Sequence, residues 1–175
     1  MNFSRKMRRS RRRQEQIVNP AKEAEKYCKE DKDKTHIEKR FVSNEIGWGV
    51  ITTTARTKGE FLLEYAGDEI TADEATRREG LYEEKGLGSF LFYFGRNKCI
   101  DATVDNGRLG RFVNDAVGSK ENCVMKPLKI GGTTRLCLFA KWDIDAGEEL
   151  RYDYGIDDLP WRKVCYSCIS NISEW

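Results

Sequence analysis

The sequence predicts a mostly β domain of the α+β class. Strand-like segments dominate the chain after about residue 35, and only two stretches carry the composition and capping signals of helices. Several short strands with two helices indicate a domain built from small sheets. With 175 residues, the chain is long enough for one compact domain with a real hydrophobic core and an appendage.

The two helices are predicted from their capping signals. Residues 20–34 are polar, rich in Lys, Glu and Ala, and contain no glycine. Asn19 and Pro20 occupy the preferred cap and first-turn positions, so we expect an exposed helix over residues 19–34. Further along, Thr71 is followed three residues later by Glu74, which is the spacing of a capping box. This spacing predicts a second helix from about Ala72 to Glu84.

The remaining segments are typical of β-strands. They are β-branched, apolar or aromatic and are bounded by Gly, Lys or Asn: HIEKRFV (36–42), GVITTT (49–54), EFLLEYAG (60–67), SFLFYFG (89–95) and KCIDA (98–102). A short turn or helix follows over residues 106–115. CVMKPLKI (123–130) and TTRLCLFAKW (133–142), joined by two glycines, predict a hairpin. The AGEEL turn (146–150) then leads into RYDYG (151–155).

The net charge of +2 hides an asymmetric distribution. Residues 1–13 contain seven Lys or Arg residues and no acidic residue, so the rest of the chain carries about five net negative charges. A basic arm of this kind suits a phosphate backbone, an acidic protein face or a nuclear import receptor. The alternative is a solvated tail that only aids solubility. The acidic body suits a basic peptide substrate, such as a histone tail.

Composition excludes several classes of protein. No apolar run approaches the roughly 18 residues that span a bilayer, and the start is too basic for a secretory leader, so we expect a soluble intracellular protein. The single histidine, His36, excludes a histidine-based triad or a histidine-rich metal site. The six cysteines lack a disulfide-like rhythm and are expected to be free, mostly buried thiols. Cys165, Cys168 and Cys123 do not complete a four-ligand zinc site, so no metal is expected.

The order of the motifs is more specific than any single motif. The motifs are GWGV (47–50), GEFLLEYAGDEI (59–70), FLFYF (90–94), IDAT (100–103), GRLGRFVN (107–114), AGEELRYDYG (146–155) and LPW (159–161). Over roughly residues 35–163 this series resembles the SET domain of protein lysine methyltransferases. Within that family, it is most similar to the group that monomethylates lysine 20 of histone H4.

The resemblance implies a fold and a division of the chain. The fold consists of small β-sheets around a knot-like core in which the GRLGRFVN and YDYG segments pass through one another. We expect a flexible basic arm over residues 1–18, a flanking helix over 19–34, the SET domain over 35–156 and a C-terminal flank over 157–175. The flank is expected to close over the cofactor. Methyl donor and peptide would occupy opposite faces that are joined by a narrow channel for the lysine side chain.

The resemblance also implies an activity. The donor would be S-adenosylmethionine, with S-adenosylhomocysteine as the product, and the substrate a lysine of a histone H4 tail or nucleosome. The arm could add contacts to nucleic acid or to the acidic face of the nucleosome. A nuclear location and a monomer are the corresponding expectations, and contact with a membrane is not expected.

Three tyrosines match positions of the family that act on the lysine. Tyr154 matches the catalytic tyrosine whose hydroxyl lies beside the transferring methyl group. Tyr65 matches a channel tyrosine that orients the incoming amine. Tyr152 matches the position whose hydroxyl crowds the amine and limits the product to one methyl group. The alternative for each is a buried core tyrosine with a backbone partner for its hydroxyl.

Other residues match the family's donor contacts. Trp48, with the backbone of Gly47 and Gly49, matches the first contact, where missing Cβ atoms let the main chain approach the ligand. Asn114 matches the asparagine that holds the methionine and adenine parts of the donor. Trp161 resembles the aromatic residue that folds over the adenine; a surface tryptophan is its alternative.

The chain departs from the family at two expected donor contacts. The family's Asn-His-Ser is Asn114-Asp115-Ala116 here, and a buried Asp115 would be costly without a partner. Phe90 stands where close relatives have a tyrosine that touches the donor. Each change could lower donor affinity by about 1 kcal/mol. Two alternatives therefore stay open: a weakened or inactive SET fold that binds chromatin, and a methyltransferase for a non-histone lysine.

Overall fold

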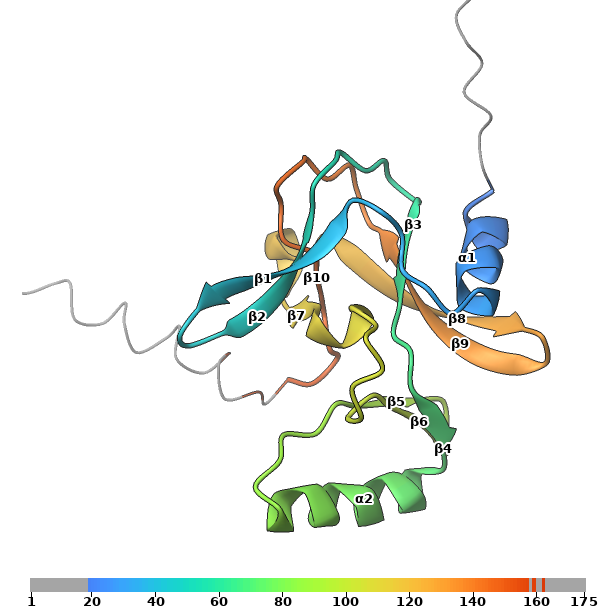
Figure 1. Cartoon of the computed structure of the whole chain (residues 1–175), viewed down its shortest axis with the longest axis vertical. Helices are drawn as coiled ribbons and strands as arrows, with labels where there is room; N and C mark the ends of the chain where they lie inside the picture. Colours follow the sequence, from blue (N-terminus) through green and yellow to red (C-terminus); the bar gives the residue numbers. More distant parts are fainter. Residues whose placement is uncertain (1–18, 158, 160–161, 163–175) are drawn as a thin grey trace, which may run out of the picture.

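The structure of the chain, a computed structural model, describes residues 19–157, 159 and 162. The predicted basic arm, Trp161, Cys165 and Cys168 lie outside the described residues. The helices and strands, labelled in Figure 1, are α1 (Pro20–Lys29), β1 (Ile37–Ser43), β2 (Gly47–Thr52), β3 (Phe61–Glu64), β4 (Asp68–Ile70), α2 (Ala72–Glu84), β5 (Leu91–Phe94), β6 (Lys98–Asp101), β7 (Asn114–Asp115), β8 (Cys123–Ile130), β9 (Thr133–Ala140) and β10 (Arg151–Tyr152).

The strands form four small sheets in the described part of the chain, as the sequence predicts. They are the β1–β2 hairpin, the β3–β9–β8 sheet, the β4–β6–β5 sheet and the β7–β10 pair. Helix α2 lies at one end of the molecule beside the β4–β6–β5 sheet, whereas α1 packs on β3 and β8 (Figure 1). No helix in the described residues is long and apolar enough to cross a membrane.

Helix α1 is shorter and less exposed than the sequence predicts. It begins at Pro20, where the Asn19 side chain accepts the N–H of Ala21, but it ends at Lys29 instead of near residue 34. Its buried face carries Ala24 and Cys28, which pack among residues of β3 and β9. The helix is exposed on one side, as the sequence predicts, but its few small and apolar residues share one buried face, which the sequence prediction did not include.

The early end of α1 leaves two carboxylates in the following turn that pair with the buried Arg108. The guanidinium of Arg108 donates to Asp33 at 2.9 Å and to Asp31 at 2.7 Å, and it also donates to Glu64 at 3.2 Å. Arg108 is only 5% exposed, so these ion pairs hold a buried charge that would otherwise be costly. The turn after α1 is therefore tied to the segment that precedes β7.

Helix α2 has the predicted bounds. The hydroxyl of Thr71 accepts the N–H of Glu74, which is one of the two bonds of a capping box. The Glu74 carboxylate binds Arg77 and Arg78 instead of making the return bond. Strand β4, which is three residues long, was not predicted. It exists because it pairs with β6, and such a short strand leaves no alternating pattern in the sequence.

The predicted hairpin of β8 and β9 is present, with Ile130 opposite Thr133. Strand β9 lies at the centre of its sheet, and together with β3 it supplies much of the apolar core. The largest core cluster includes Leu62, Leu63, Val113, Leu138, Leu150 and Tyr152. Because Val113 and Tyr152 belong to this cluster, the segments that carry the expected site residues are anchored in the core.

Strands β7 and β10 pair in parallel, with Arg151 opposite Asn114 and Tyr152 opposite Asp115. A parallel pair that is distant in sequence brings the GRLGRFVN and RYDYG segments together at the centre of the molecule (Figure 1). The backbone N–H of Ala116 extends the pairing by donating to the carbonyl of Tyr152. The sequence prediction that these two segments meet is therefore confirmed.

The four cysteines among the described residues, Cys28, Cys99, Cys123 and Cys137, are buried and free, as predicted. Within the described part of the chain, no group of three or more His, Cys, Asp and Glu side chains is placed to hold a metal ion.

Candidate functional site

Two cavities meet at Tyr154. The first, which we call the tyrosine cavity, has a volume of about 410 Å³ and is lined by Tyr65, Ser89, Phe90, Leu91, Phe92, Tyr93, Arg111, Tyr152, Tyr154, Gly155 and Ile156. The second, which we call the carboxylate cavity, has a volume of about 320 Å³ and is lined by Glu45, Ile46, Asn114, Asp115, Glu149, Arg151 and Tyr154. Tyr154 lines both cavities.

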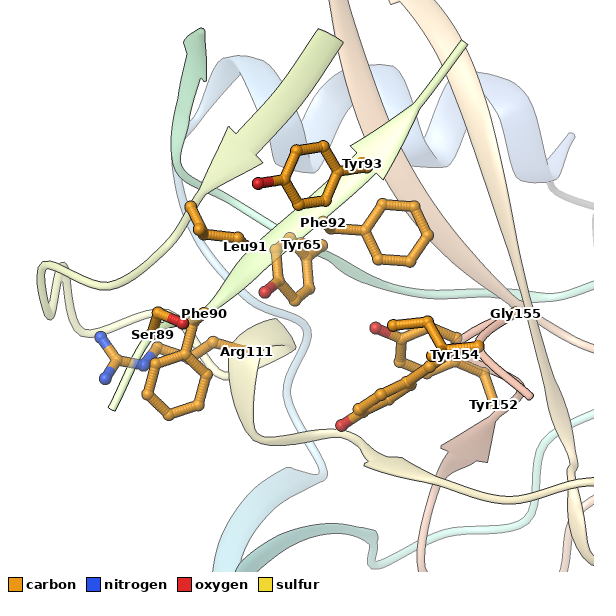
Figure 2. A pocket seen from close by; sticks show the side chains of 11 residues that line it. Tyr65, Ser89, Phe90, Leu91, Phe92, Tyr93, Arg111, Tyr152, Tyr154 and Gly155 are labelled. Atoms are coloured by element: carbon orange, nitrogen blue, oxygen red, sulfur yellow. The ribbon is translucent and has the colours of Figure 1, made fainter. Parts of the chain in front are cut away.

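The three tyrosines that the sequence singles out converge on the tyrosine cavity. Tyr65 follows β3, Tyr152 ends β10, and Tyr154 lies two residues later. The rings of Tyr152 and Tyr154 are 4.8 Å apart between centroids, and Phe92 connects Tyr152 (6.1 Å) with Tyr65 (5.7 Å). Figure 2 shows the side chains of Tyr65, Phe92 and Tyr152 around one space, with Tyr154 beside Tyr152. The result is an aromatic enclosure.

Tyr154 is held at both its phenol and its backbone. The hydroxyl donates a hydrogen bond to the carbonyl of Val113 at 2.8 Å, and the N–H donates to Oδ1 of Asp115 at 3.1 Å. Val113 directly precedes β7 and Asp115 ends it, and β7 pairs with β10. The parallel pair therefore positions the phenol.

The phenols of the cavity are neutral over the ordinary pH range. Burial raises the pKa of Tyr65, Tyr152 and Tyr154 above the usual value of 10. The negative charge of Asp115 raises the pKa of Tyr154 further. Tyr65 and Tyr152 are 6% and 2% exposed, so little water reaches their rings. A neutral aromatic wall of this kind disfavours an ammonium ion and lowers the pKa of an amine that enters.

The carboxylate cavity is organised by Asn114 and Glu149. The Asn114 side-chain amide donates to the carbonyl of Trp48 at 3.1 Å and to Oε1 of Glu149 at 2.8 Å. These bonds join β7 to the β1–β2 hairpin and to the segment before β10. A Cβ added to Gly49 would lie 2.6 Å from Oε1 of Glu149 and 3.1 Å from the Asn114 amide nitrogen. A larger residue at position 49 would therefore have to displace these side chains.

The other residues of the GWG motif lie at the edge of this arrangement. Gly47 has a φ of +80°, in the left-handed region that favours glycine, and its neighbour Ile46 lines the carboxylate cavity. Trp48 is 48% exposed, and its ring packs against Phe41 with 5.7 Å between centroids. The Trp48 carbonyl, rather than its indole, contacts the Asn114 amide.

Phe90 lies in the tyrosine cavity and does not line the carboxylate cavity. The guanidinium carbon of Arg111 is 4.1 Å from the centroid of the Phe90 ring, and Nη1 of the same guanidinium donates a hydrogen bond to the carbonyl of Thr103. Phe90 therefore stands apart from Asn114 and Asp115, although the sequence places all three among the expected donor contacts.

In the structure, the buried Asp115 has a cationic partner that the sequence analysis did not identify. Its side chain is 5% exposed, and Arg162 binds it through two nitrogens, with 2.8 Å between Nε and Oδ2. Sequence reasoning missed both Arg162 and Glu149. The sequence did indicate that a buried Asp115 needs a cationic partner, because an unpaired buried carboxylate is costly. It did not indicate that this partner is Arg162.

Residues 47–155 match the family described as the SET domain. This match covers more than half of the chain, and it includes every residue of the two cavities except Glu45, Ile46 and Ile156. The chain therefore belongs to the SET-domain family.

Relatives to which the chain is similar are named as lysine methyltransferases. N-lysine methyltransferase KMT5A-A of Xenopus laevis is 42% identical over 127 residues, which are 67% of this chain and 37% of that protein. Histone-lysine N-methyltransferase Set8 of Drosophila melanogaster is 42% identical over 113 residues, which are 62% of this chain and 16% of that protein. The chain thus matches little more than a third of its curated relatives at most.

A solved structure also matches the fold. The crystal structure of CpSET8 from Cryptosporidium superposes with a TM-score of 0.67 at 34% identity, covering 79% of this chain and 66% of the other. The predicted class of small β-sheets with a preceding helix is thereby confirmed.

Proposed function

We propose that this chain is a protein lysine N-methyltransferase that uses S-adenosylmethionine and adds one methyl group to a lysine of histone H4. One observation carries the proposal: Tyr154 lines both a cavity walled mainly by aromatic side chains and a cavity lined by carboxylates. Transfer of a methyl group from a sulfonium to an amine needs these two environments on the two sides of one reacting centre.

The tyrosine cavity suits the side chain of a substrate lysine. Its walls are rings from Tyr65, Phe92 and Tyr152, which can surround an aliphatic stem and hold a cationic centre over their faces. Because the wall is apolar and the phenols remain protonated, the amine is favoured in its neutral form, which is the form that can attack. Tyr65 would orient the amine through its hydroxyl.

The carboxylate cavity fits a cationic methyl donor. Its volume of about 320 Å³ lies at the lower end of small-molecule pockets, about 300–1,000 Å³. Glu45 and Glu149 contribute negative charge, and the missing Cβ of Gly49 lets the side chains of Glu149 and Asn114 approach the main chain beside the cavity. When bound, S-adenosylmethionine supplies an electrophilic methyl group on a positively charged sulfur. The Tyr154 oxygen would hold that methyl group in line with the amine through weak C–H···O contacts.

Tyr152 supports transfer of a single methyl group. It is buried between the rings of Phe92 and Tyr154 and lines the tyrosine cavity, so we expect its hydroxyl to take up space beside the substrate amine. An amine that already carries one methyl group would then lack room to turn its lone pair toward a second donor. This assignment follows the match of Tyr152 to the family position at which a tyrosine limits the product.

The substrate and the location follow from the relatives and from charge. The Drosophila relative is named a histone-lysine methyltransferase, which supports a histone substrate and a nuclear, chromatin-associated role for this chain. The net negative charge after residue 13 suits a basic histone tail. The basic arm of residues 1–18 would add contacts to nucleosomal DNA or to the acidic face of the nucleosome.

An inactive SET fold that only binds chromatin is not favoured. The departure at Asp115 raised this alternative because an unpaired buried carboxylate would damage the site. Since Arg162 pairs with Asp115 and the Asn114 amide binds Glu149 and Trp48, the departure is compatible with an ordered donor cavity.

The decisive experiment is methylation with labelled S-adenosylmethionine of nucleosomes, free histones and a peptide array, with Tyr154→Phe as the matched variant. We expect labelling of histone H4 by the wild type and a loss of about 10²-fold or more in Tyr154→Phe, the effect typical of one positioned group at a reacting centre. No labelling of any substrate would exclude the enzyme. Labelling that persists in Tyr154→Phe would exclude the role given to Tyr154. Labelling of peptides from other proteins but not of histones would show that the substrate is not a histone.

A further inference from the structure

Arg162 connects two carboxylates that flank Tyr154. Its Nε donates to Oδ2 of Asp115 at 2.8 Å, and its Nη2 donates to Oδ1 of Asp153 at 2.7 Å and also to Oδ1 of Asp115. Asp115 ends β7, and Asp153 directly follows β10. One guanidinium therefore joins the two segments of the parallel pair that carries the candidate site.

The same two carboxylates hold the backbone on both sides of the Tyr154 side chain. Oδ1 of Asp115 accepts the N–H of Tyr154 at 3.1 Å, and Oδ1 of Asp153 accepts the N–H of Gly155 at 2.8 Å. Two consecutive backbone N–H groups are thus bound by carboxylates that Arg162 also binds. Gly155 has a φ of +73°, so the chain turns sharply at this point and is held in the turn.

The charges of this cluster depend on one another. The Asp115 side chain is 5% exposed, and a buried carboxylate is stable in its ionised form only when it is paired. The bond to Arg162 lowers the pKa of Asp153, and the two carboxylates raise the pKa of Arg162. A guanidinium suits this position because its fork can bind one carboxylate through two nitrogens while reaching a second.

We infer that Arg162 is a positioning residue for the methyl transfer, an inference that rests on the proposed function. Arg162 fixes Asp115 and Asp153, these fix the backbone of Tyr154, and the backbone keeps the phenol bonded to the carbonyl of Val113 between the two cavities. Asp115, which stands where the family has histidine, thereby serves as the acceptor that links Arg162 to Tyr154.

Three variants separate positioning from general damage. Arg162→Gln keeps a polar side chain but removes the charge and the fork, whereas Arg162→Lys keeps the charge and can make part of the bonds. Arg77→Gln is the control, because Arg77 is an exposed arginine on α2 (side chain 61% exposed) that also pairs with a carboxylate. Thermal unfolding of each variant shows whether it is folded.

The first measurement is backbone amide exchange by NMR, which needs no activity. We expect the amides of Tyr154 and Gly155 to exchange about tenfold faster in Arg162→Gln, with an intermediate change in Arg162→Lys and none in Arg77→Gln. Unchanged exchange at both amides in Arg162→Gln would overturn the inference. So would equal acceleration in the Lys and Gln variants, since the retained charge would then have no effect.

The second measurement separates kcat from the KM for S-adenosylmethionine. A displaced phenol affects the transferring methyl group more than donor binding, so Arg162→Gln should lower kcat at least about fivefold and change KM less than about twofold. Arg162→Lys should recover part of kcat. A rise in KM with unchanged kcat would overturn the inference. If the wild type methylates no substrate, the proposed function fails, whereas amide exchange still decides whether Arg162 positions Tyr154.

Discussion

The two cavities on either side of Tyr154 differ in the charge of their walls. The tyrosine cavity is lined by four tyrosines, two phenylalanines and one leucine, together with Arg111. The carboxylate cavity has three acidic side chains, Glu45, Asp115 and Glu149, and one basic side chain, Arg151, that pairs with Glu149. Among the described residues, the lining of the first cavity therefore has Arg111 as its one charged side chain, whereas in the second the acidic side chains outnumber the basic ones, even when Arg162, which pairs with Asp115, is included.

Under the proposed function, this difference would let one domain handle two cations with opposite requirements. A lysine must lose its charge before it can attack, which a neutral aromatic wall promotes. A sulfonium donor must keep its charge, which nearby carboxylates stabilise. Because β7 and β10 pair in parallel, residues in or next to the two strands line the two cavities. Tyr154, which follows β10, lines both of them.

The largest expected effect that tests this contrast is the dependence of the rate on pH. Burial raises the pKa of Tyr65 and Tyr154, so both phenols stay protonated while the substrate amine begins to lose its proton. We expect kcat/KM on a peptide to rise by about tenfold per pH unit until the amine is neutral, with no fall below about pH 10.

The same shifts have a defined sign for stability. A group whose pKa is raised in the folded state stabilises it below the usual pKa of 10, and this stabilisation is lost as the pH rises further. Thermal unfolding from about pH 7 to 11 should therefore show the loss only at the alkaline end. A rate that declines between about pH 8 and 9, while the protein remains folded, would mean that a tyrosine ionises there and the cavity is not neutral.

Gly49→Ala should weaken the carboxylate cavity specifically. The new Cβ would lie 2.6 Å from Glu149 and must displace it, so we expect donor affinity by calorimetry to fall about tenfold, with a destabilisation of about 1–3 kcal/mol. Gly80→Ala on α2 is the control, because its Cβ meets nothing within 4 Å. It should raise the free energy of unfolding by about 0.5–1 kcal/mol and leave donor binding unchanged. Donor binding by Gly49→Ala at wild-type strength would place the donor elsewhere.

Tyr152→Phe tests whether the hydroxyl of Tyr152 limits the product to one methyl group. The phenyl ring can keep the packing against Phe92 and Tyr154, whereas loss of the hydroxyl leaves room for a second methyl group. We expect mass spectrometry to find dimethylated peptide, with a rate of first methylation within about tenfold of the wild type. Tyr93→Phe, at a side chain that is 48% exposed on the same cavity, should still yield one methyl group. A monomethylated product from Tyr152→Phe would assign the product limit to another residue.

The smallest effect is expected for Phe90→Tyr. Since Phe90 lines the tyrosine cavity, a hydroxyl added there should change donor affinity by less than about twofold, below the worth of one hydrogen bond. Calorimetry with S-adenosylmethionine measures this directly. A gain of tenfold would mean that the donor extends past Tyr154 into the tyrosine cavity, and the two cavities would then not be separate binding sites.

The parts of the fold that local signals determine were predictable. The Thr71 and Glu74 spacing located α2 correctly, and the Gly131-Gly132 pair located the β8–β9 hairpin. The predictions failed where distant residues decide the structure. Helix α1 ends early because its following turn supplies Asp31 and Asp33 to Arg108, which lies more than seventy residues further along the chain. Strand β4 exists only through its pairing with β6.

The same division applies to the candidate site. The order of motifs identified Tyr65, Tyr152, Tyr154 and Asn114, and the structure brings them to the two adjoining cavities. The partners of these residues were not predictable. Glu149 binds Asn114 and Arg162 binds Asp115, and these bonds depend on the parallel pairing of β7 with β10 rather than on any local spacing.

The sequence alone determined the family, the capped helix α2 and the identity of the aromatic and glycine residues at the site, because ordered motifs and capping patterns are local properties of the chain. Only the tertiary structure decided which charges meet. The buried ion pairs Asp115–Arg162 and Glu64–Arg108 join residues that are 47 and 44 positions apart in the sequence. The sequence shows that a buried carboxylate requires a cationic partner, but it does not show which Lys or Arg side chain that partner is.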